Sequence, residues 1–241
     1  MFSFKERNQM IQQLKEGEFD LVIIGGGITG AGVALQAAAS GLSVALLEMQ
    51  DFAEGTSSRS TKLVHGGLRY LKTFDVEVVA DTVSERAIIQ GIAPHIPKAD
   101  PMILPIFDEP GSTFNLFSVK VAMDLYDHLA GITGGKYANY MLSKEEILER
   151  EPQLASDGLL GGGVYLDYRN NDARLVIENM KRAVADGAIA VSRMKVDEII
   201  HDDQGKVSGV KAKDVLTDKT ITVNSKLVIN TAGPWSDLVN K

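Results

Sequence analysis

The sequence predicts an α/β fold built around a parallel sheet, and the segment Phe19–Glu48 carries most of that prediction. An apolar stretch with the pattern of a buried strand, Leu21–Ile24, runs directly into a glycine-rich turn. A helix of small residues follows and is closed by Gly41. A second apolar stretch, Ser43–Leu47, then ends at Glu48. Strand, turn, helix and strand in this order form a βαβ unit, in which the two strands run parallel.

The glycines of the turn have the spacing GxGxxG, as Gly25, Gly27 and Gly30. The first permits a tight turn out of the strand, the second leaves room for a pyrophosphate, and the third lets the helix pack close to the sheet. The unpaired N–H groups of the helix start favour an anion. Glu48 can accept both ribose hydroxyls of an adenosine and would repel a 2′-phosphate, so NADP is not expected. The pattern predicts a Rossmann-like dinucleotide site; the alternative is a structural glycine-rich turn.

Composition fits a globular protein with one large domain, or a domain and a lobe, because 44% of the 241 residues are hydrophobic and 24% are charged. The sequence has no cysteine, which excludes disulfides, iron–sulfur clusters and thiolate zinc sites. A net charge of −7 argues against nucleic-acid binding. No apolar run is long enough for a transmembrane helix, and the N-terminus lacks the apolar core of a signal peptide, so we expect a cytoplasmic protein.

Two kinds of catalytic site are not expected. The four histidines lie far apart and show no metal-binding spacing, so no metal is predicted. A GxSxG motif is missing, which argues against a serine hydrolase.

A cationic, hydroxyl-rich stretch runs from Gly55 to Lys72 and reads GTSSRSTKLVHGGLRYLK. It contains Arg59, Lys62 and Arg69 but no acidic residue. Hydroxyl groups, glycine backbone and cations are suited to phosphate oxygens, so we expect this loop to return over the pyrophosphate. The alternative is a solvated loop that leads into a basic helix.

The remaining elements follow from hydrophobic periodicity and from turn and capping signals. A short amphipathic helix with Phe4, Met10, Ile11 and Leu14 precedes the first strand. Further helices are expected at 76–92, at 115–129, after a Ser143/Glu146 capping box, and at 173–186 with Asp172 as the cap. Strands are expected over the sequence MILPIF, at 164–168 after Gly161–Gly163, and at 189–192, 196–200, 207–215, 220–223 and 227–230.

The last strand leads into Thr231, Ala232, Gly233 and Pro234. A turn of small residues after a parallel strand lets the backbone approach a bound nucleotide closely. The alternative is an ordinary strand-to-helix turn with proline at the first helical position.

Together these motifs resemble a known family. The run from Gly25 to Glu48 is similar to the FAD fingerprint of glutathione-reductase-like and D-amino-acid-oxidase-like flavoproteins. The combination of GGGITGAG, GTSSRSTKLVHGGLRYLK, YDHLAG, RNNDARLVIENMK and NTAGPWSD is narrower. It resembles the FAD-dependent glycerol-3-phosphate dehydrogenase family and, within it, the bacterial α-glycerophosphate oxidases, over essentially the whole chain.

The resemblance implies FAD as cofactor and a role for individual residues. His65 and Gly66 would lie close to the isoalloxazine, with His65 as the catalytic candidate. Arg69 would bind the phosphate or hydroxyl end of the substrate, with Tyr70 beside it. The cofactor-binding positions would be Ile24, Gly25, Gly26, Gly27, Ile28, Thr29, Gly30, Glu48, Met49, Ser57, Ser58, Thr61, Lys62, Leu63, Val196, Ala232 and Gly233.

It also implies an organisation of the chain. Residues 1–18 would be an N-terminal helix and 19–241 an FAD-binding domain of the glutathione-reductase/D-amino-acid-oxidase type. Inserted helices and strands at about 75–170 would contribute to the substrate side, and a β-rich segment follows. Members of the family are much longer than 241 residues, so we expect the chain to be truncated.

The implied reaction is oxidation of sn-glycerol 3-phosphate to dihydroxyacetone phosphate by hydride transfer to flavin N5, with O2 as acceptor and H2O2 as product. A quinone-linked dehydrogenase of the same family is the alternative, and would leave a peripheral membrane contact open. A different amine or hydroxy-acid oxidase of the same superfamily is a further alternative, and so is a nucleotide-binding fragment without catalysis. The oligomeric state is not indicated.

Overall fold

The computed structural model describes residues 2–110 and 115–239, and it divides the chain into two compact units. The first unit combines Met1–Thr61 with Asn171–Lys241, and the second consists of Lys62–Asn170. The second unit includes the segment at about 75–170 that the sequence analysis assigned to the substrate side, and that role stays a prediction. Each unit has its own sheet and its own apolar cores.

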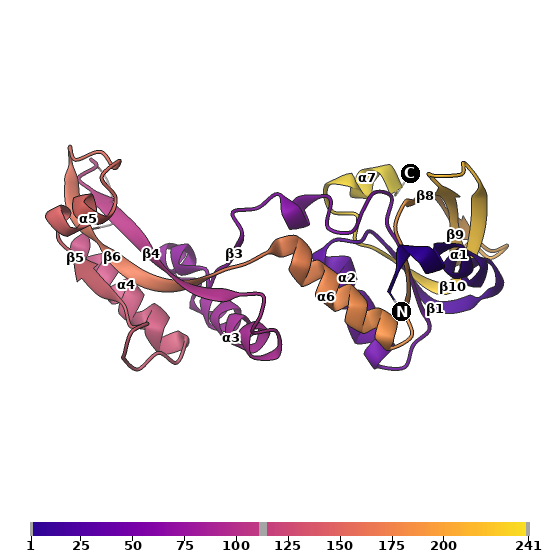
Figure 1. Cartoon of the computed structure of the whole chain (residues 1–241), viewed down its shortest axis with the longest axis horizontal. Coiled ribbons are helices and arrows are strands. Elements are labelled where there is room, and N and C mark those ends of the chain that lie inside the picture. The colour runs from indigo at the N-terminus through magenta and orange to yellow at the C-terminus, as the bar shows by residue number, and fades with distance from the viewer. Residues whose placement is uncertain (1, 111–114, 240–241) are drawn as a thin grey trace. The chain divides into compact units, whose positions relative to one another are not determined.

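The first unit is a sheet with helices on both faces (Figure 1). In the described residues its sheet has the order β7-β2-β1-β10-β9-β8, in which β7, β2, β1 and β10 pair parallel to one another, whereas the β10–β9 and β9–β8 pairs are antiparallel. Its strands are β1 (Glu18–Ile24), β2 (Val44–Leu47), β7 (Ile189–Val191), β8 (Met194–His201), β9 (Val207–Asp214) and β10 (Thr220–Asn230). Its helices are α1 (Arg7–Glu16), α2 (Ile28–Ala39), α6 (Asp172–Ala185) and α7 (Ser236–Val239), with 3-10 turns at Phe4–Glu6, Thr56–Ser58 and Gly233–Trp235.

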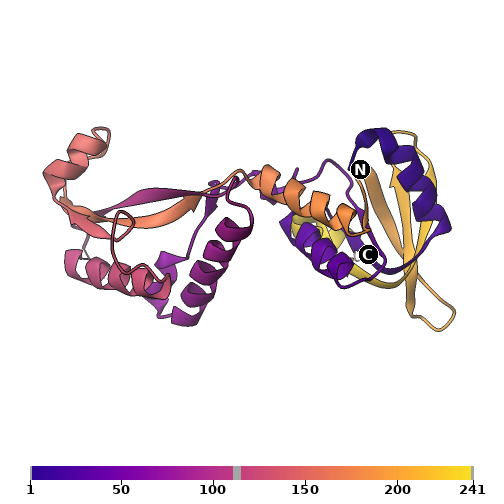
Figure 2. The same cartoon turned by 60° about the horizontal axis from the view of Figure 1, so that its bottom comes forward.

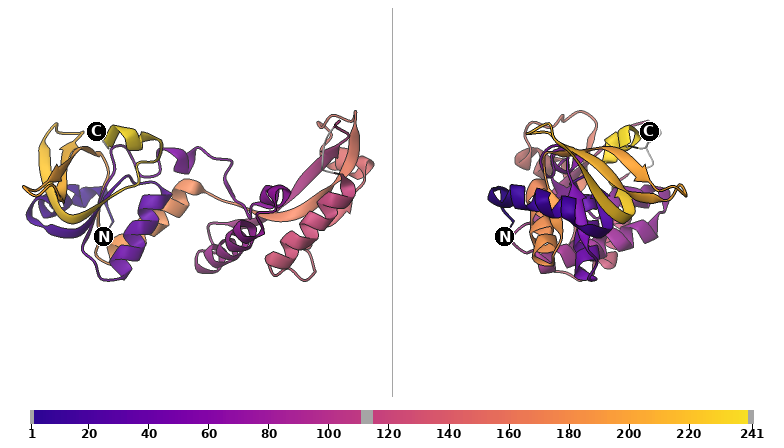
Figure 3. Two further views of the ribbon diagram at one scale, coloured as in Figure 1. Left: turned by 180° about the vertical axis from the view of Figure 1, so that it is seen from behind. Right: turned by 90° about the vertical axis from the view of Figure 1, so that its right-hand side faces the viewer.

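Alternation along β1 explains why both faces of this sheet are covered. Leu21 and Ile23 are buried against α2 and α6, whereas Val22 and Ile24 are buried in the other core, with Leu14 of α1. Successive side chains of a strand point to opposite faces, so an unbroken apolar stretch requires cover on both. Figure 1 shows α2 and α6 side by side, and Figure 3 shows the twisted antiparallel strands β8, β9 and β10 from behind.

The parallel arrangement brings three chain segments to one edge of the sheet. The carboxyl ends of β1, β2 and β10 lie together, because Ile24 pairs with Leu47 on one side and with Asn230 on the other. This edge is where open α/β sheets bind ligands. Strands β1 and β2 from the start of the chain and β10 from its end therefore form the carboxyl end of the parallel sheet together.

Several sequence predictions for the first unit need correction. The stretches 220–223 and 227–230 form one strand, because Thr220–Asn224 pair with β9 and 224–230 with β1. The cap of α6 is Asn171, whose side chain accepts a hydrogen bond from Arg174 N at 3.1 Å, and not Asp172. The amphipathic N-terminal helix is confirmed as α1, but Phe4 precedes it and is exposed.

The second unit is a smaller antiparallel sheet with helices on both faces. Its strands are β3 (Leu63–Val64), β4 (Lys98–Phe107), β5 (Tyr140–Leu142) and β6 (Leu159–Arg169), with β6 paired to the other three. Its helices are α3 (Val76–Ile92), α4 (Leu116–Leu129) and α5 (Lys144–Arg150), with a 3-10 turn at Leu68–Thr73. Figure 2 shows α3 and α4 on one side of the sheet and α5 on the other, which agrees with the cores on either side of β6.

In this unit the helix predictions hold, but both strand predictions are too short: β4 begins at Lys98, before the sequence MILPIF, and β6 begins at Leu159, before the predicted 164–168. The predicted helices at 76–92 and 115–129 are confirmed, the second with Asn115 as its cap, and so is the Ser143/Glu146 capping box of α5. Gly161–Gly163, expected before the strand, lie inside β6. Helix α4 and strand β4 approach β6 closely there: a Cβ on Gly163 would lie 2.3 Å from Met123 Cε, and a Cβ on Gly162 would lie 2.4 Å from Leu104 O. No helix in the described ranges has the length and apolar character needed to cross a membrane.

Candidate functional site

A cavity of about 490 Å³ lies at the edge of the first unit where β1, β2 and β10 end. Its volume is in the range of small-molecule and cofactor sites. The lining comes from four segments of the chain: Ile24, Gly25, Gly27, Ile28 and Thr29; Leu47, Glu48, Met49, Gln50 and 54–57; Lys195, Val196 and Asp197; and Thr231–Trp235 with Leu238 and Val239.

The glycine-rich turn at the floor of this cavity leaves no room for side chains. Gly25 has a φ of +105°, which side-chain-bearing residues rarely adopt, and a Cβ there would lie 2.7 Å from Thr231 O. A Cβ on Gly30 would lie 2.0 Å from Gly25 O. The hydroxyl of Thr231 donates to the carbonyl oxygens of Ile24 (2.8 Å) and Gly25 (3.1 Å). The turn is therefore held between β10 and the first turn of α2.

The N-terminus of α2 faces a hydroxyl from another part of the chain. Gly27 is the N-cap residue and has no side chain, and the first N–H groups of a helix have no partner inside it. Ile28 N donates to Ser57 Oγ at 2.9 Å. A Cβ on Gly27 would lie 3.1 Å from the same oxygen. The backbone amides of the helix start and the Ser57 hydroxyl thus form one polar surface suited to an anion.

Glu48 connects the end of β2 to the glycine-rich turn. Its Oε2 accepts a hydrogen bond from Gly26 N at 2.6 Å, and its Oε1 accepts one from Gln50 N at 2.7 Å. A carboxylate has about four acceptor positions, so each oxygen can still accept a bond from a ligand. The residue is half-buried, and these two bonds fix its orientation toward the cavity that it lines.

Residues after β10 form the wall nearest the C-terminus. Asn230 Oδ1 accepts a hydrogen bond from Ala232 N at 2.9 Å, which stabilises the turn into the last 3-10 helix. Trp235, half-buried, packs against Gly55: a Cβ on that glycine would lie 2.8 Å from the indole ring. The indole therefore supports the turn that carries Ser57 on the opposite side of the cavity.

Many of the sequence-predicted cofactor positions gather around this cavity. Those that line it are Ile24, Gly25, Gly27, Ile28, Thr29, Glu48, Met49, Ser57, Val196, Ala232 and Gly233. Gly26 and Gly30 lie beneath the lining: the first donates to Glu48, and the second is buried under the turn. Ser58 and Thr61 belong to the first unit but are not part of the lining. Their cofactor roles stay predictions.

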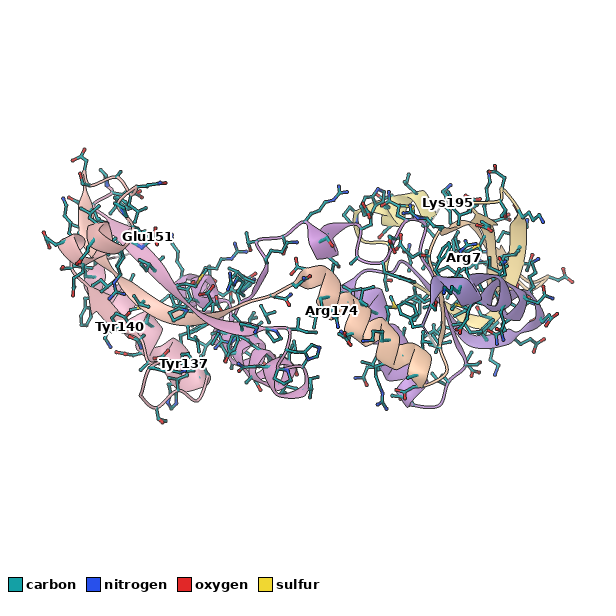
Figure 4. The ribbon with its side chains drawn as sticks, in the orientation of Figure 1. Arg7, Tyr137, Tyr140, Glu151, Arg174 and Lys195 are labelled. Carbon is teal, nitrogen blue, oxygen red and sulfur yellow. The ribbon has the colours of Figure 1, made fainter. Side chains whose placement is uncertain are left out.

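Several lining residues are not among the predicted cofactor-binding positions. Lys195 and Asp197 flank the predicted Val196 and pair with each other at 2.6 Å; Figure 4 labels Lys195 on this side of the unit. Gln50 and Trp235 are further examples. Only their position next to predicted residues in the sequence could have indicated them.

The other predicted residues belong to the second unit: Lys62, Leu63, His65, Arg69 and Tyr70. Arg69 is exposed, its guanidinium lies 5.1 Å from the centre of the Tyr70 ring, and its Nη2 donates to Tyr70 OH at 3.4 Å. Arg69 also lines a mostly apolar groove of about 810 Å³ between the 3-10 turn at Leu68–Thr73, β4 and α4. His65 is exposed on the turn that precedes this 3-10 helix.

In the part of the chain that the structure describes, no three His, Asp or Glu side chains gather as a metal site would require.

Residues 20–241 match a family model described as FAD dependent oxidoreductase. A protein named alpha-glycerophosphate oxidase from Enterococcus casseliflavus is 69% identical over 240 residues, which is 100% of this chain and 39% of that protein. The solved glycerol-3-phosphate dehydrogenase from Bacillus halodurans, complexed with FAD, is 45% identical at a TM-score of 0.75, over 98% of this chain and 38% of that one.

A more distant solved structure agrees with the fold alone. The L-alpha-glycerophosphate oxidase from Mycoplasma pneumoniae, with FAD bound, has a TM-score of 0.64 and 18% identity over 93% of this chain and 57% of that one. The chain thus spans about two-fifths of the length of the curated relatives that it matches.

Proposed function

The chain belongs to the FAD-dependent oxidoreductase family, and on that basis we propose that the protein oxidises sn-glycerol 3-phosphate to dihydroxyacetone phosphate with FAD as cofactor. The observation that carries the substrate assignment is the likeness over the whole chain to proteins named alpha-glycerophosphate oxidase. The likeness extends through both units, so it includes the cavity of the first unit and the cationic stretch that leads into the second.

The residues of the cavity fit the ADP half of FAD. A Cβ on Gly25, Gly26 or Gly30 would collide with neighbouring atoms of the protein, so only glycines form this turn, and the amides of α2 with the Ser57 hydroxyl supply donors for a pyrophosphate. Glu48 supplies a carboxylate for ribose hydroxyls. Val196, Ala232 and Gly233 would contact the adenosine. Bound there, FAD would supply the two-electron acceptor for oxidation at C2 of the substrate.

On the substrate side we assign the phosphate to Arg69. A planar, permanently charged guanidinium suits a phosphate dianion, and the contacts of Arg69 with Tyr70 restrict its orientation. The phosphate is remote from C2, so holding it would position the carbon that reacts. His65 would lie next to the reacting groups, and the base that takes the C2 hydroxyl proton is left unassigned.

We propose O2 as the final electron acceptor, with H2O2 released, and a cytoplasmic location. A quinone-linked dehydrogenase is the second candidate, because the solved Bacillus halodurans structure is titled a dehydrogenase. The two share every residue role given above and differ only in the acceptor.

An absorbance spectrum of the purified full-length protein tests the proposal. Flavin bands that bleach when glycerol 3-phosphate is added in aerated buffer, with peroxide appearing, would support the oxidase. Bleaching without peroxide would favour the quinone-linked enzyme. Flavin bands that never bleach would refute the substrate and leave the cofactor in place, and a colourless protein would refute both. The same spectrum should be recorded for the 241-residue chain alone. Flavin bands that do not bleach with glycerol 3-phosphate there, but do bleach in the full-length protein, would identify the chain as a nucleotide-binding fragment without catalysis.

A further inference from the structure

A buried polar cluster in the second unit has no part in the function proposed so far. Arg86, Tyr126 and Asp167 are 3%, 0% and 2% exposed, and they come from α3, α4 and β6. Arg86 Nη1 donates to Tyr126 OH at 2.6 Å and to Asp167 Oδ1 at 2.9 Å, and Tyr126 OH donates to the same carboxylate oxygen at 3.1 Å. The Arg86 guanidinium also lies over the ring of Tyr168, at 4.8 Å.

The cluster converges on one backbone position, Gly66. Gly66 N donates both to Tyr126 OH and to Asp167 Oδ1, each at 3.0 Å, and Gly66 O accepts from Thr82 Oγ1 at 2.8 Å, a hydroxyl that Gly66 O shares with Val78 O of α3 at the same distance. A Cβ on Gly66 would lie 2.2 Å from Tyr126 OH and 2.4 Å from Val83 Cγ1. The N–H and the C=O of Gly66 are therefore hydrogen-bonded to side chains from α3, α4 and β6. A residue with a Cβ would clash at this position.

The fixed residue stands beside His65 in a tight turn. Gly67 has a φ of +73°, and in this conformation its N–H donates to Nδ1 of His65 at 3.1 Å. A ring nitrogen that accepts a hydrogen bond carries no proton, so the neutral imidazole carries its proton on Nε2. His65 is exposed, and it therefore presents an N–H donor outward.

Stability alone does not account for the cluster. A buried ion pair often contributes no more than apolar residues of the same volume. This one is also incompletely satisfied, since Arg86 Nε is buried without a hydrogen-bond partner among the described residues. The cluster does hold the Gly66 amide in place, next to His65, because Tyr126 OH and Asp167 Oδ1 both accept hydrogen bonds from it.

We propose that Arg86, Tyr126 and Asp167 are positioning residues: they fix Gly66 and thereby the turn in which the Gly67 amide selects the Nε2–H form of neutral His65. This inference rests on the proposed function for the role of His65. It makes His65 a hydrogen-bond donor to an oxygen of the substrate. It also means that the C2 hydroxyl proton goes to a group other than Nε2 of His65, because that nitrogen already carries a proton.

The variant pair Thr82→Val and Thr82→Ser tests the clamp in the FAD-loaded full-length protein. Valine keeps the shape and removes the hydroxyl that donates to Gly66 O, whereas serine keeps the hydroxyl. We expect Thr82→Val to lower kcat about tenfold, with KM for glycerol 3-phosphate and FAD content changed less than about twofold. Thr82→Ser should restore kcat. Loss in both variants, or in neither, would overturn the proposal.

Tyr126→Phe tests the cluster itself, with Tyr165→Phe as the matched control. Tyr165 packs edge-on against Tyr126 at 5.7 Å, whereas the acceptors of Gly66 N are Tyr126 OH and Asp167 Oδ1, so the hydroxyl of Tyr165 tests general packing. We expect Tyr126→Phe to lower kcat about tenfold, with KM unchanged, and Tyr165→Phe to leave both unchanged. Equal losses would mean that the cluster acts through packing alone and would overturn the proposal.

Imidazole ¹⁵N spectra of selectively labelled protein provide a readout other than activity. The sequence has four histidines, and a His65→Gln variant identifies the signal of His65. We expect the Nε2–H form in the wild type and a mixture of both neutral forms in Thr82→Val and Tyr126→Phe. The Nδ1–H form in the wild type, or unchanged spectra in both variants, would overturn the inference. These spectra decide it even if glycerol 3-phosphate is not the substrate, and the flavin spectrum decides the substrate separately.

Discussion

At the scale of single residues, two glycines of α2 occupy the same helix but different surroundings. A Cβ on Gly30 would lie 2.0 Å from Gly25 O and 2.8 Å from Thr231 Oγ1, whereas a Cβ on Gly32 meets nothing within 4 Å. We expect Gly30→Ala to displace the turn, to lose FAD and to destabilise the protein by about 1–3 kcal/mol. Gly32→Ala should retain FAD and stabilise the helix by up to about 1 kcal/mol. Flavin absorbance per protein and thermal unfolding measure both effects.

The two alanine variants share a helix and a chemical change, so their comparison isolates the contact with the turn. If Gly30→Ala bound a full complement of FAD with an unchanged melting temperature, close packing at Gly30 would not be what forms the site.

Arg69 and Lys72 offer a second comparison within one 3-10 turn, Leu68–Thr73. Both carry a positive charge, but only Arg69 has a planar guanidinium stacked on a tyrosine ring. We expect Arg69→Ala to raise KM for glycerol 3-phosphate at least about tenfold, because one charge-assisted contact to phosphate contributes about 1.5–3 kcal/mol. Lys72→Ala should change KM much less, and FAD should remain bound in both. Steady-state kinetics of the full-length protein provide the measurement; a similar rise in both variants would indicate general charge attraction instead of a clamp.

How far the sequence predicts the site depends on whether a residue acts through its own backbone or through contacts that folding creates. Gly25 and Gly30 were predictable because their roles follow from spacing next to a strand and a helix start. The bonds of Ser57 to Ile28 N and of Glu48 to Gly26 N were not, because they join positions that only the folded sheet brings together. The clamp on Gly66 is of the same kind, since its partners come from three separate elements.

At the scale of elements, the start of α6 shows why a helix cap is hard to place within one residue. Asn171 and Asp172 are both good capping residues, but the structure uses Asn171, whose Oδ1 accepts from Arg174 N at 3.1 Å. Asp172 instead lies in the first turn of the helix and accepts a hydrogen bond from Ser60. The tertiary contact with Ser60 selects between two candidates that local sequence leaves equal.

Replacement of the cap therefore has a specific expected cost. Asn171→Ala should lower the free energy of unfolding by about 1 kcal/mol, whereas Asn171→Asp keeps a side-chain acceptor and should change it by less than about 0.5 kcal/mol. Urea unfolding measures both. A loss of the same size in both variants would show that the cap bond does not stabilise α6.

Strand boundaries were less predictable than helix boundaries for a related reason. The sequence predicts two strands, 220–223 and 227–230, yet β10 is continuous because its two halves pair with different neighbours. Gly161–Gly163 were expected to precede a strand, yet they lie inside β6, where Gly162 and Gly163 permit the close approach of Leu104 and Met123. In contrast, α3, α4 and the capping box of α5 depend on local periodicity and local hydrogen bonds, and the sequence predicted them well.

At the scale of the whole molecule, a buried ion pair connects the start of the chain to the strand β9 far along it. Arg7 of α1 donates to both carboxylate oxygens of Asp214, at 3.1 and 2.7 Å, and both side chains are buried (Figure 4 labels Arg7). The hydrogen bonds from Arg7 lower the pKa of Asp214 to about 2. An unfolded aspartate has a pKa of about 3.9, so the folded state favours the ionised form.

This shift predicts a pH dependence of stability. Because the folded pKa is lowered, the contribution of Asp214 is complete above about pH 4 and is lost as the pH falls from there through 2; it amounts to about 2 kcal/mol. Asp214→Asn should therefore be less stable than the wild type at pH 7, and the difference should shrink at acidic pH. Asp218→Asn is the control, because Asp218 is an exposed partner of Lys213. A difference that stayed constant from pH 7 to pH 2 in urea unfolding would contradict the assignment.

The division into two units also shows what sequence patterns cannot indicate. The second unit begins at Lys62, earlier than the segment at about 75–170 that the sequence outlined. The two-residue strand β3 and the bond from Asn170 N to Lys62 O close this unit, and neither has a sequence signal of its own. The roles of the two units in binding cofactor and substrate stay predictions.

The first unit combines Met1–Thr61 with Asn171–Lys241, which begins more than a hundred residues later in the sequence. Tryptophan fluorescence can test whether FAD binds in the cavity that these two segments form. Trp235 is the only tryptophan in the 241 residues; it lines the cavity and supports Gly55 on the opposite side. FAD that binds in the cavity would lie close to the indole, so titration of FAD into the apo form of this chain should quench tryptophan fluorescence strongly and saturably. Trp235→Phe should remove the signal while flavin absorbance still shows binding. If FAD bound stoichiometrically without quenching Trp235, the cofactor would occupy another place, and the cavity at the ends of β1, β2 and β10 would not be the flavin site.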